Sequence, residues 1–339
     1  MTASAPETRS RPRERQPMKF VTFGPRNRVG LLVNDRILDL AIAAGAHTLG
    51  GDAWVATFGS LQGLIESGSH GLDIVGRLAD KLAGADQPSL WLDAAETSLN
   101  APWPGQRFFL AGSNNPSHQS EAFTNMGDAL TVEEAREKGR ALPPSGFWGQ
   151  ARPIMGPDAD IQIPKRANGY FDFEAEPGII LGKQGKDIKA SDGAAYVWGV
   201  TLVADWSIRI PEWPPKPNPP FMPVKNFDCS KSIGPCIVVG EVDADDFMLS
   251  TIVNGTVRQH FSSNEMIYSF AEILEYYSRD FTFFPGDVIA GGTGAGTAID
   301  QTKPNADRSW PVDLFLKPGD EVEIKGEGIG SLVSRITAP

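Results

Sequence analysis

The chain is organised around the run Asn168-Gly-Tyr-Phe-Asp-Phe-Glu-Ala-Glu-Pro-Gly-Ile-Ile-Leu-Gly182, in which Glu174 and Glu176 stand two apart among apolar residues. Residues i and i+2 of a β-strand point to the same face, so the two carboxylates are expected side by side. One interpretation is the solvated face of an amphipathic strand. The apolar continuation after Gly178 favours another, a buried strand, where carboxylates occur paired, hydrogen-bonded or bound to a metal.

A second apolar run, residues 196–204, ends directly before Asp205 and supplies a third carboxylate. A carboxylate at a strand end can converge on Glu174 and Glu176. Three carboxylates and water form the oxygen-rich donor set that Mg²⁺, Mn²⁺ or Ca²⁺ prefers. We therefore predict a divalent cation site on these three residues, with Mg²⁺ as the first choice.

Composition excludes several classes of protein. The chain has 339 residues, 41% of them hydrophobic and 22% charged, as in a globular protein with room for two domains. Its formal net charge of -11 argues against nucleic acid as a main partner. No apolar run approaches the roughly 18 to 20 residues that span a bilayer, so no membrane partner is expected.

The cysteines and the N-terminus give information about the cellular compartment of the protein. Cys229 and Cys236 are the only cysteines and match no zinc or C-x-x-C pattern, which predicts a reducing cytoplasm. Residues 1–17 are polar, carry four arginines and lack the apolar core of a signal peptide. We expect this segment to be a disordered leader.

The pattern of the chain predicts two units. Short alternating runs within 18–40 indicate a β-meander, and apolar spacings of three and four within 41–82 indicate helices. Ala101-Pro-Trp-Pro-Gly105 marks a boundary, after which the chain is rich in strands and turns. The fold class predicted is α+β and mainly β, with a small N-terminal α+β domain (18–100) and a larger unit (101–339).

Two later elements are predicted from local signals. Asn254-Gly255 between the runs 250–253 and 256–261 predicts a hairpin, and the apolar spacing within 265–278 predicts a helix. The proline-rich segment 211–223 cannot be a helix or a central strand. It is either a PxxP ligand for a partner domain or a stiff loop over a site.

The glycine-rich run Gly291-Gly-Thr-Gly-Ala-Gly-Thr297 is not a nucleotide loop. It lacks the Gly-Lys-Ser/Thr ending of a P-loop and the G-x-G-x-x-G spacing, and no helical pattern is expected after it. Its backbone N–H groups and the Thr293 hydroxyl can approach an anion such as a carboxylate. The alternative is a flexible turn.

His118 and Glu121 stand three apart, so on a helical turn starting near Pro116 they share a face. A carboxylate beside an imidazole raises its basicity, as required of a general base acting on water. The alternative is a surface contact. Lys225 and Arg209 add cations near the same segments, either as structural ion pairs or as groups that bind a substrate carboxylate or enolate oxygen.

Taken together these segments resemble the fumarylacetoacetate hydrolase family, in the family's order from Met18 to the C-terminus. The matching motifs are G-x-N-Y-x-x-H-x-x-E at Gly112, Asn114, His118 and Glu121; E-x-E at Glu174 and Glu176; Asp205-Trp-Ser-Ile-Arg209; G-K-S-F-D at Val224-Lys-Asn-Phe-Asp228; and P-G-D-V-I-x-x-G-T from Pro285 through Gly292 and Thr293.

The resemblance implies a rolled, mixed β-sheet catalytic domain, a homodimer, and Mg²⁺ or a similar cation on Glu174, Glu176 and Asp205. It implies an enzyme that hydrolyses carbon–carbon bonds in ketonic substances, here a β-diketone or an acylpyruvate-like 2,4-dioxo acid. Decarboxylases, hydratases and isomerases of related 2-oxo acids share the site and are the alternative. It implies catalytic roles for His118, Glu121 and Lys225, and substrate-binding roles for Arg209, Glu212, Thr293, Gly292 and Asn114.

The sequence departs from the family pattern around the substrate. The tyrosine of G-x-N-Y is Asn115, the lysine of F-x-K is Gln150 or is displaced within 147–150, and the glutamine of R-D-x-Q is Glu212. These changes predict an unusual substrate that is less anionic, or bulkier and more aromatic. Pro177, which follows the E-x-E pair, predicts a bend there or an edge strand.

Overall fold

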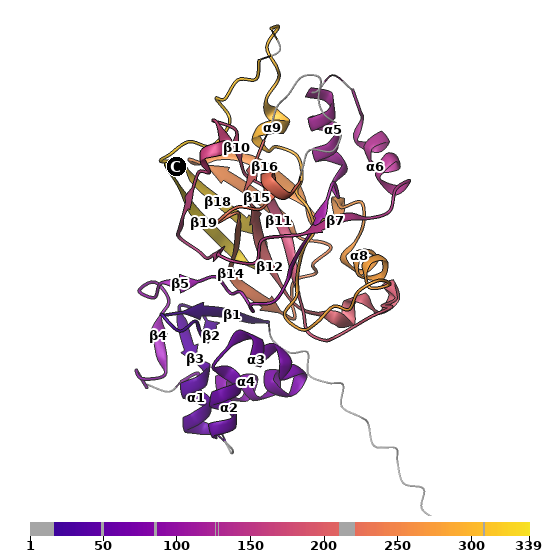
Figure 1. Cartoon of the computed structure of the whole chain (residues 1–339). Helices are drawn as coiled ribbons and strands as arrows, with labels where there is room; N and C mark the ends of the chain where they lie inside the picture. Colours follow the sequence, from indigo (N-terminus) through magenta and orange to yellow (C-terminus); the bar gives the residue numbers. More distant parts are fainter. Residues whose placement is uncertain are drawn as a thin grey trace, which may run out of the picture.

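The computed structural model describes residues 17–48, 51–84, 87–125, 127, 129–209, 221–307 and 309–339. Figure 1 shows an N-terminal group of helices and strands beneath a larger, mainly β body. The fold is α+β and mainly β, as predicted. None of the helices in these ranges combines the length and the apolar character needed to cross a membrane.

The larger sheet contains twelve of the described strands. In order across the sheet they are β4 (Trp91–Asp93), β3 (Arg36–Asp39), β2 (Arg28–Val33), β1 (Met18–Phe23), β14 (Lys231–Val239), β12 (Val197–Asp205), β11 (Ala175–Leu181), β17 (Val288–Ala290), β6 (Phe108–Gly112) and β7 (Ser145–Trp148), with β5 (Leu99–Asn100) on β1 and β8 (Ile154–Met155) on β14.

The predicted β-meander is the hairpin series β1–β3, and it joins the same sheet as the later strands. Met18 pairs with Val239, and Phe20 pairs with Ile237. The hydrogen-bond ladder therefore crosses the predicted boundary near residue 100.

The second sheet has five strands and lies against one face of the first. Its order is β16 (Thr256–Ser262), β15 (Met248–Val253), β18 (Glu321–Gly326), β19 (Gly330–Thr337) and β9 (Ala159–Gln162), and a separate pair joins β10 (Phe171–Asp172) to β13 (Ser207–Ile208). The predicted hairpin is β15–β16, with positive φ at both Asn254 and Gly255, as its two-residue turn requires.

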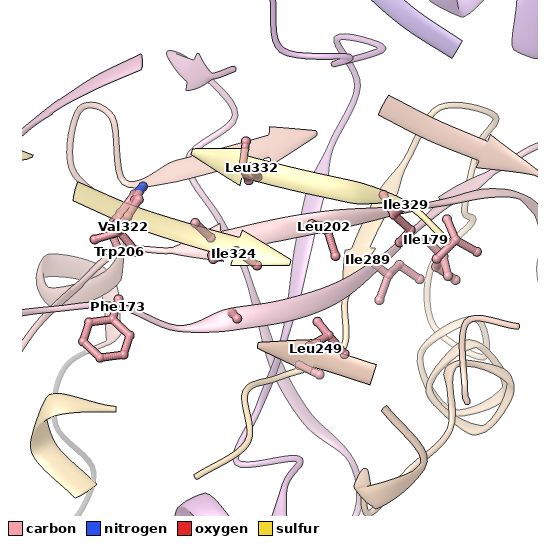
Figure 2. Close-up of a cluster of buried hydrophobic side chains, with 14 of the residues drawn as sticks. Phe173, Ile179, Leu202, Trp206, Leu249, Ile289, Val322, Ile324, Ile329 and Leu332 are labelled. Carbon is pink, nitrogen blue, oxygen red and sulfur yellow. The ribbon is translucent and has the colours of Figure 1, made fainter. Parts of the chain in front are cut away.

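Side-chain alternation along the central strands builds two cores. Ile179 and Leu202 face the second sheet, in the cluster that Figure 2 shows, whereas Ile180 and Val203 face the opposite way. That opposite core includes residues of helices from the predicted helical region: α1 (Leu40–His47), α2 (Gly51–Phe58), α3 (Leu61–Glu66) and α4 (Gly68–Leu82). The central strands are thus covered on both faces, which explains their continuous apolar runs.

The remaining described helices are α5 (Pro116–Asn125), α6 (Val132–Arg140), α7 (Phe221–Lys225), α8 (Phe270–Tyr277) and α9 (Ala298–Gln301). Two expectations need correction. The helix predicted from residue 265 begins at Phe270, because Ser269 caps it, and a short helix, α9, does follow the glycine-rich loop, capped by Thr297.

Pro177 lies in the interior of the sheet, so the prediction of an edge strand was wrong. Strand β11 has β12 on one side and β17 on the other, but the β17 ladder begins only at Gly178. The Pro177 carbonyl accepts a hydrogen bond from the backbone of Gly291, just beyond that ladder. The missing N–H of Pro177 therefore removes no hydrogen bond from the ladder between β11 and β17.

Candidate active site and metal centre

The structure brings Glu174, Glu176 and Asp205 together. Ala175 pairs with Ala204 across β11 and β12, so Glu174 lies opposite Asp205, and the Asp205 N–H donates to the Glu174 carbonyl at 3.0 Å. All three side chains are buried, and one carboxylate oxygen from each lies within 4.8 Å of the others. The buried-strand interpretation of Glu-x-Glu is confirmed, and the solvated-face interpretation is wrong.

Glu176 is held by the glycine-rich loop. The backbone N–H of Gly292 donates to Glu176 Oε2 at 3.0 Å. Burial, together with the nearby charges of Asp205 and Glu174, raises the pKa of Glu176 well above its ordinary value. Crowded buried carboxylates of this kind favour a cation among them.

Lys225 supplies positive charge to the cluster. Its Nζ donates to Asp205 Oδ2 at 2.8 Å, to Ser207 Oγ at 2.6 Å, and to Glu174 Oε2. Burial alone would raise the pKa of Glu174, but Lys225 and Arg209 outweigh it and hold that pKa well below its usual range. Glu174 is therefore ionised, as a metal ligand must be.

Arg209 links the cluster to α9 through a residue that the sequence did not reveal, Asp172. Arg209 Nη2 donates to Glu174 at 2.6 Å, and its Nε donates to Asp172 at 2.8 Å. Asp172 also accepts from the backbone N–H groups of Ala298 at 2.7 Å and Ile299 at 3.1 Å. The sequence signal for Asp172 was the alternation of side chains along a strand, because residues 172, 174 and 176 are spaced to point to the same face.

His118 is paired with Asp300 and not with Glu121. His118 Nδ1 lies 2.8 Å from Asp300 Oδ2. Burial alone would lower the pKa of His118, but the Asp300 carboxylate outweighs it and the net pKa is raised. Glu121 is exposed on α5, where partial desolvation and Asp300 raise its pKa. The expected His118–Glu121 contact is replaced because α9 brings Asp300 to the imidazole.

Asp300 was missed because no helix was expected after the glycine-rich loop. The loop ends in Thr297-x-x-Asp300, and Thr297 Oγ1 caps α9 by accepting from Asp300 N, while Asp300 Oδ2 accepts from Thr297 N at 3.1 Å. This Thr-x-x-acid spacing is a capping-box signal that was present in the sequence.

A second lysine, Lys231, was also missed. It lies directly opposite Asp205 across β12 and β14, and its Nζ is 2.7 Å from Asp205 Oδ1. Burial lowers its pKa, and Asp205 opposes that effect. No motif marks a lysine at the first position of a strand, since its partner depends on the register between strands.

Three of the predicted substrate-binding residues, Asn114, Gly292 and Thr293, line a cavity of about 90 Å³ beside the carboxylates. Its lining comprises Ala111, Gly112, Ser113, Asn114, His118, Phe147, Glu174, Glu176, Asp205, Arg209, Lys225, Gly292 and Thr293. Asn114 also ties neighbouring segments together, because its Nδ2 donates to the carbonyls of Tyr268 and Gly291 at 2.9 Å each. Thr293 Oγ1 accepts from Gln259 at 2.8 Å.

Glu212 and most of the proline-rich segment lie in 210–220, outside the described residues, as do residues 1–16 of the leader. Their predicted roles stay predictions.

The cavity of this mixed-sheet fold is lined by a buried carboxylate cluster and by His118, which pairs with Asp300, and this arrangement is consistent with an enzyme of the fumarylacetoacetate hydrolase type. Residues 107–337 match the family described as fumarylacetoacetate (FAA) hydrolase C-terminal, and the chain belongs to that family. The resemblance read from its motifs is confirmed.

Known relatives carry different activities in their names. The chain is 32% identical over 210 residues to human oxaloacetate tautomerase FAHD2B, mitochondrial; this match covers 60% of the chain and 63% of the human protein. A maleylpyruvate hydrolase from Sphingobium sp. SYK-6, solved with manganese(II) and pyruvate, has a TM-score of 0.68 at 19% identity, covering 95% of this chain and 99% of that one. A 2-hydroxyhepta-2,4-diene-1,7-dioate isomerase from Mycobacterium marinum has a TM-score of 0.61 at 21% identity, covering 95% and 98%.

Proposed function

We propose that this protein is a divalent-cation-dependent hydrolase that cleaves a carbon–carbon bond of a β-diketone or an acylpyruvate-like 2,4-dioxo acid. The observation that carries the proposal is that His118, which pairs with Asp300, lines the same cavity as the three carboxylates. A base and a cation site facing one another suit a substrate with two carbonyl groups separated by one carbon.

The carboxylate cluster fits a hard divalent cation. Glu174, Glu176 and Asp205 offer only oxygen donors, all are buried, and the raised pKa of Glu176 reflects its burial beside two further carboxylates. These three residues would hold Mg²⁺, or Mn²⁺ or Ca²⁺ in its place. When bound, the cation would supply Lewis-acid stabilisation of negative charge on the substrate oxygens.

The side chains around the cavity have separate roles in this proposal. His118, supported by Asp300 and with Glu121 nearby, takes a proton from water, and the resulting hydroxide adds to the distal carbonyl carbon. The carbon–carbon bond then breaks, its electron pair passes to the 2-oxo fragment, and that fragment takes up a proton. One water is consumed. A 2,4-dioxo acid yields two acids, and a β-diketone without a carboxylate yields one acid and one ketone. Lys225, Arg209 and Thr293 hold or polarise substrate oxygens.

We propose a substrate that is bulkier and more aromatic than simple acylpyruvates, consistent with a role in the catabolism of aromatic compounds. Phe147 on β7 contributes a large apolar ring to the cavity lining. Comparing kcat/KM for a short acylpyruvate and an aryl diketone tests this. Equal rates on both would contradict it.

The second candidate is isomerisation on the same site, including keto–enol tautomerisation of a 2-oxo acid. It is favoured by the name of the 32%-identical human relative, an oxaloacetate tautomerase. In this reaction His118 would take a proton from the carbon between the carbonyl groups and return it elsewhere. No water is consumed. Decarboxylation or hydration of a related acid are further variants.

Product mass distinguishes these reactions. The full chain is incubated with MgCl₂ or MnCl₂ and a panel of diketo acids, β-diketones and oxaloacetate. Hydrolysis yields two fragments whose summed mass exceeds that of the substrate by one water. Tautomerisation leaves the mass unchanged, decarboxylation releases CO₂, and hydration adds water without fragmentation. Absence of the two fragments across the panel, with any of the other products formed, would overturn the hydrolase proposal.

We also propose a cytoplasmic homodimer. The support is the family resemblance for the dimer and the cysteine usage for the compartment. Light scattering on the purified protein tests the dimer, and a monomer at micromolar concentration would contradict it.

A further inference from the structure

Lys231 is the lysine at this site that the proposed reaction does not use. Its side chain is 0% exposed, and it is absent from the lining of the cavity that holds Lys225. Its Nζ contacts Asp205 Oδ1 at 2.7 Å and donates to the backbone carbonyl of Lys225. It therefore reaches a predicted metal ligand from behind, where no substrate can touch it.

Asp205 is compensated on both oxygens by lysine. Lys225 Nζ contacts Oδ2 at 2.8 Å, and Lys231 Nζ contacts Oδ1 at 2.7 Å. When ionised, Glu174, Glu176 and Asp205 carry three negative charges, and Asp172, joined to Glu174 through Arg209, carries a fourth. Lys225, Lys231 and Arg209 carry three positive charges. The remaining charge of minus one is smaller than the charge that a divalent cation brings.

Gly149 lies beside the end of the Lys231 side chain. A Cβ added to Gly149 would lie 3.5 Å from Lys231 Cε and only 2.4 Å from Leu110 Cδ1. Gly149 belongs to the stretch 147–150, from which the lysine of the F-x-K pattern is missing. The second buried ammonium group thus comes from Lys231 at the start of β14, and the Lys231 side chain packs beside Gly149.

We propose that Lys231 is an internal counter-ion with two effects. It stabilises the folded protein when no metal occupies the carboxylate cluster, and it weakens the binding of the divalent cation by electrostatic repulsion. Buried like charges within a few ångströms repel strongly, since little water screens them. Removing the Lys231 charge frees Asp205 Oδ1 and leaves the cluster with a net charge of minus two. The inference rests on the metal site of the proposed function and not on the reaction.

The test compares wild type with Lys231→Met and Lys231→Gln as full chains stripped with EDTA. Titration calorimetry with MnCl₂ alone should give a Kd lower than that of wild type by roughly tenfold or more for both variants. Their unfolding temperature without metal should fall, and saturating Mn²⁺ should raise it by more than in wild type. Glutamine is included because it keeps a polar side chain at this position while losing the charge beside Asp205.

Lys325→Met is the matched control, because Lys325 is 51% exposed and pairs with Glu323 at 3.3 Å on the second sheet. Its Mn²⁺ affinity should equal that of wild type. An unchanged or weaker Mn²⁺ affinity in Lys231→Gln would overturn the inference, as would a Lys231→Gln protein that stays unfolded with and without Mn²⁺. A wild type that binds no Mn²⁺, Mg²⁺ or Ca²⁺ while both variants also bind none would instead refute the metal site itself.

Discussion

The imidazole of His118 is supported by a carboxylate 182 positions further along the chain. Asp300 Oδ2 accepts from the backbone of Gly296 and Thr297 at 3.1 Å each, so the carboxylate is fixed before it meets the ring. A fixed partner selects the tautomer with the proton on Nδ1 and leaves Nε2 as the basic nitrogen. This is the arrangement that a general base requires.

Replacing His118 by alanine should abolish turnover and leave Mn²⁺ binding unchanged, because the imidazole is not among the three clustered carboxylates. Calorimetry and a product assay on the same preparation measure the two effects. Loss of Mn²⁺ binding together with turnover would show that the roles are not separate. His47→Ala provides the control, because His47 lies in α1, which is distant from His118 in the sequence.

Replacing Asp300 by asparagine should move the acidic limb of the pH–rate profile to lower pH. Burial by itself lowers the pKa of His118 and Asp300 raises it, so removing the carboxylate lowers the net pKa. A general base works when neutral, so the base form then persists to lower pH. We also expect kcat to fall by about 10²- to 10⁴-fold through loss of orientation.

The control for this shift is Asp313→Asn, at an exposed position. Its profile should coincide with that of wild type. An acidic limb that stays in place in Asp300→Asn, despite a lower kcat, would mean that another group titrates there.

At the scale of elements, the glycine-rich loop acts as a clamp on β11 and on the segment before α5 through Gly292, whose backbone is left-handed. Gly292 has φ +94°, and a Cβ there would lie 3.2 Å from Asn114 Cβ. Its N–H reaches Glu176 only in this conformation, which residues other than glycine rarely adopt. The loop thereby connects a predicted metal ligand with the segment before His118.

Gly292→Ala should destabilise the protein by about 1 to 3 kcal/mol and weaken Mn²⁺ binding, since both the backbone and the Glu176 contact are disturbed. Urea unfolding and calorimetry measure the two quantities. Gly255→Ala is the matched control: φ there is +79°, and nothing lies within 4 Å of the added Cβ. It should cost stability without changing Mn²⁺ affinity, and the same affinity change in both variants would contradict a local clamp.

The elements also show what the sequence could and could not predict. Alternation and the Asn-Gly turn predicted the meander and the β15–β16 hairpin, because both depend on residues close in the chain. Asp205 was found because it ends an apolar run. Asp300 and Lys231 reach the site through a four-residue helix and a cross-strand register, and neither leaves a periodic pattern to read. The identity of the partner of His118 therefore could not follow from spacing.

At the scale of the whole molecule, a cation held by the buried carboxylates would couple metal binding to global stability. Saturation with Mn²⁺ at about 100 times Kd should stabilise the folded chain by about 2.7 kcal/mol, and EDTA should reverse the gain. Glu176→Gln should lose this gain without being less stable in EDTA, because it removes a crowded carboxylate. Differential scanning calorimetry checks both expectations.

Glu96→Gln, at an exposed position, is the control and should keep the full response to Mn²⁺. A Glu176→Gln protein that is stabilised by Mn²⁺ as much as wild type would remove Glu176 from the ligand set.

The ladder between β1 and β14 makes the segment that begins at β1 and ends near residue 100 an integral part of the larger sheet. Without this segment, Ile237 loses its partner Phe20, and the buried side chains of Ile233 and Trp198 lose the core they share with α1–α4. An unpaired apolar edge recruits other chains. A fragment covering 101–339 should therefore aggregate when expressed alone and be recovered in soluble form when 18–100 is supplied as a separate polypeptide, so the protein should be divisible into two complementing pieces.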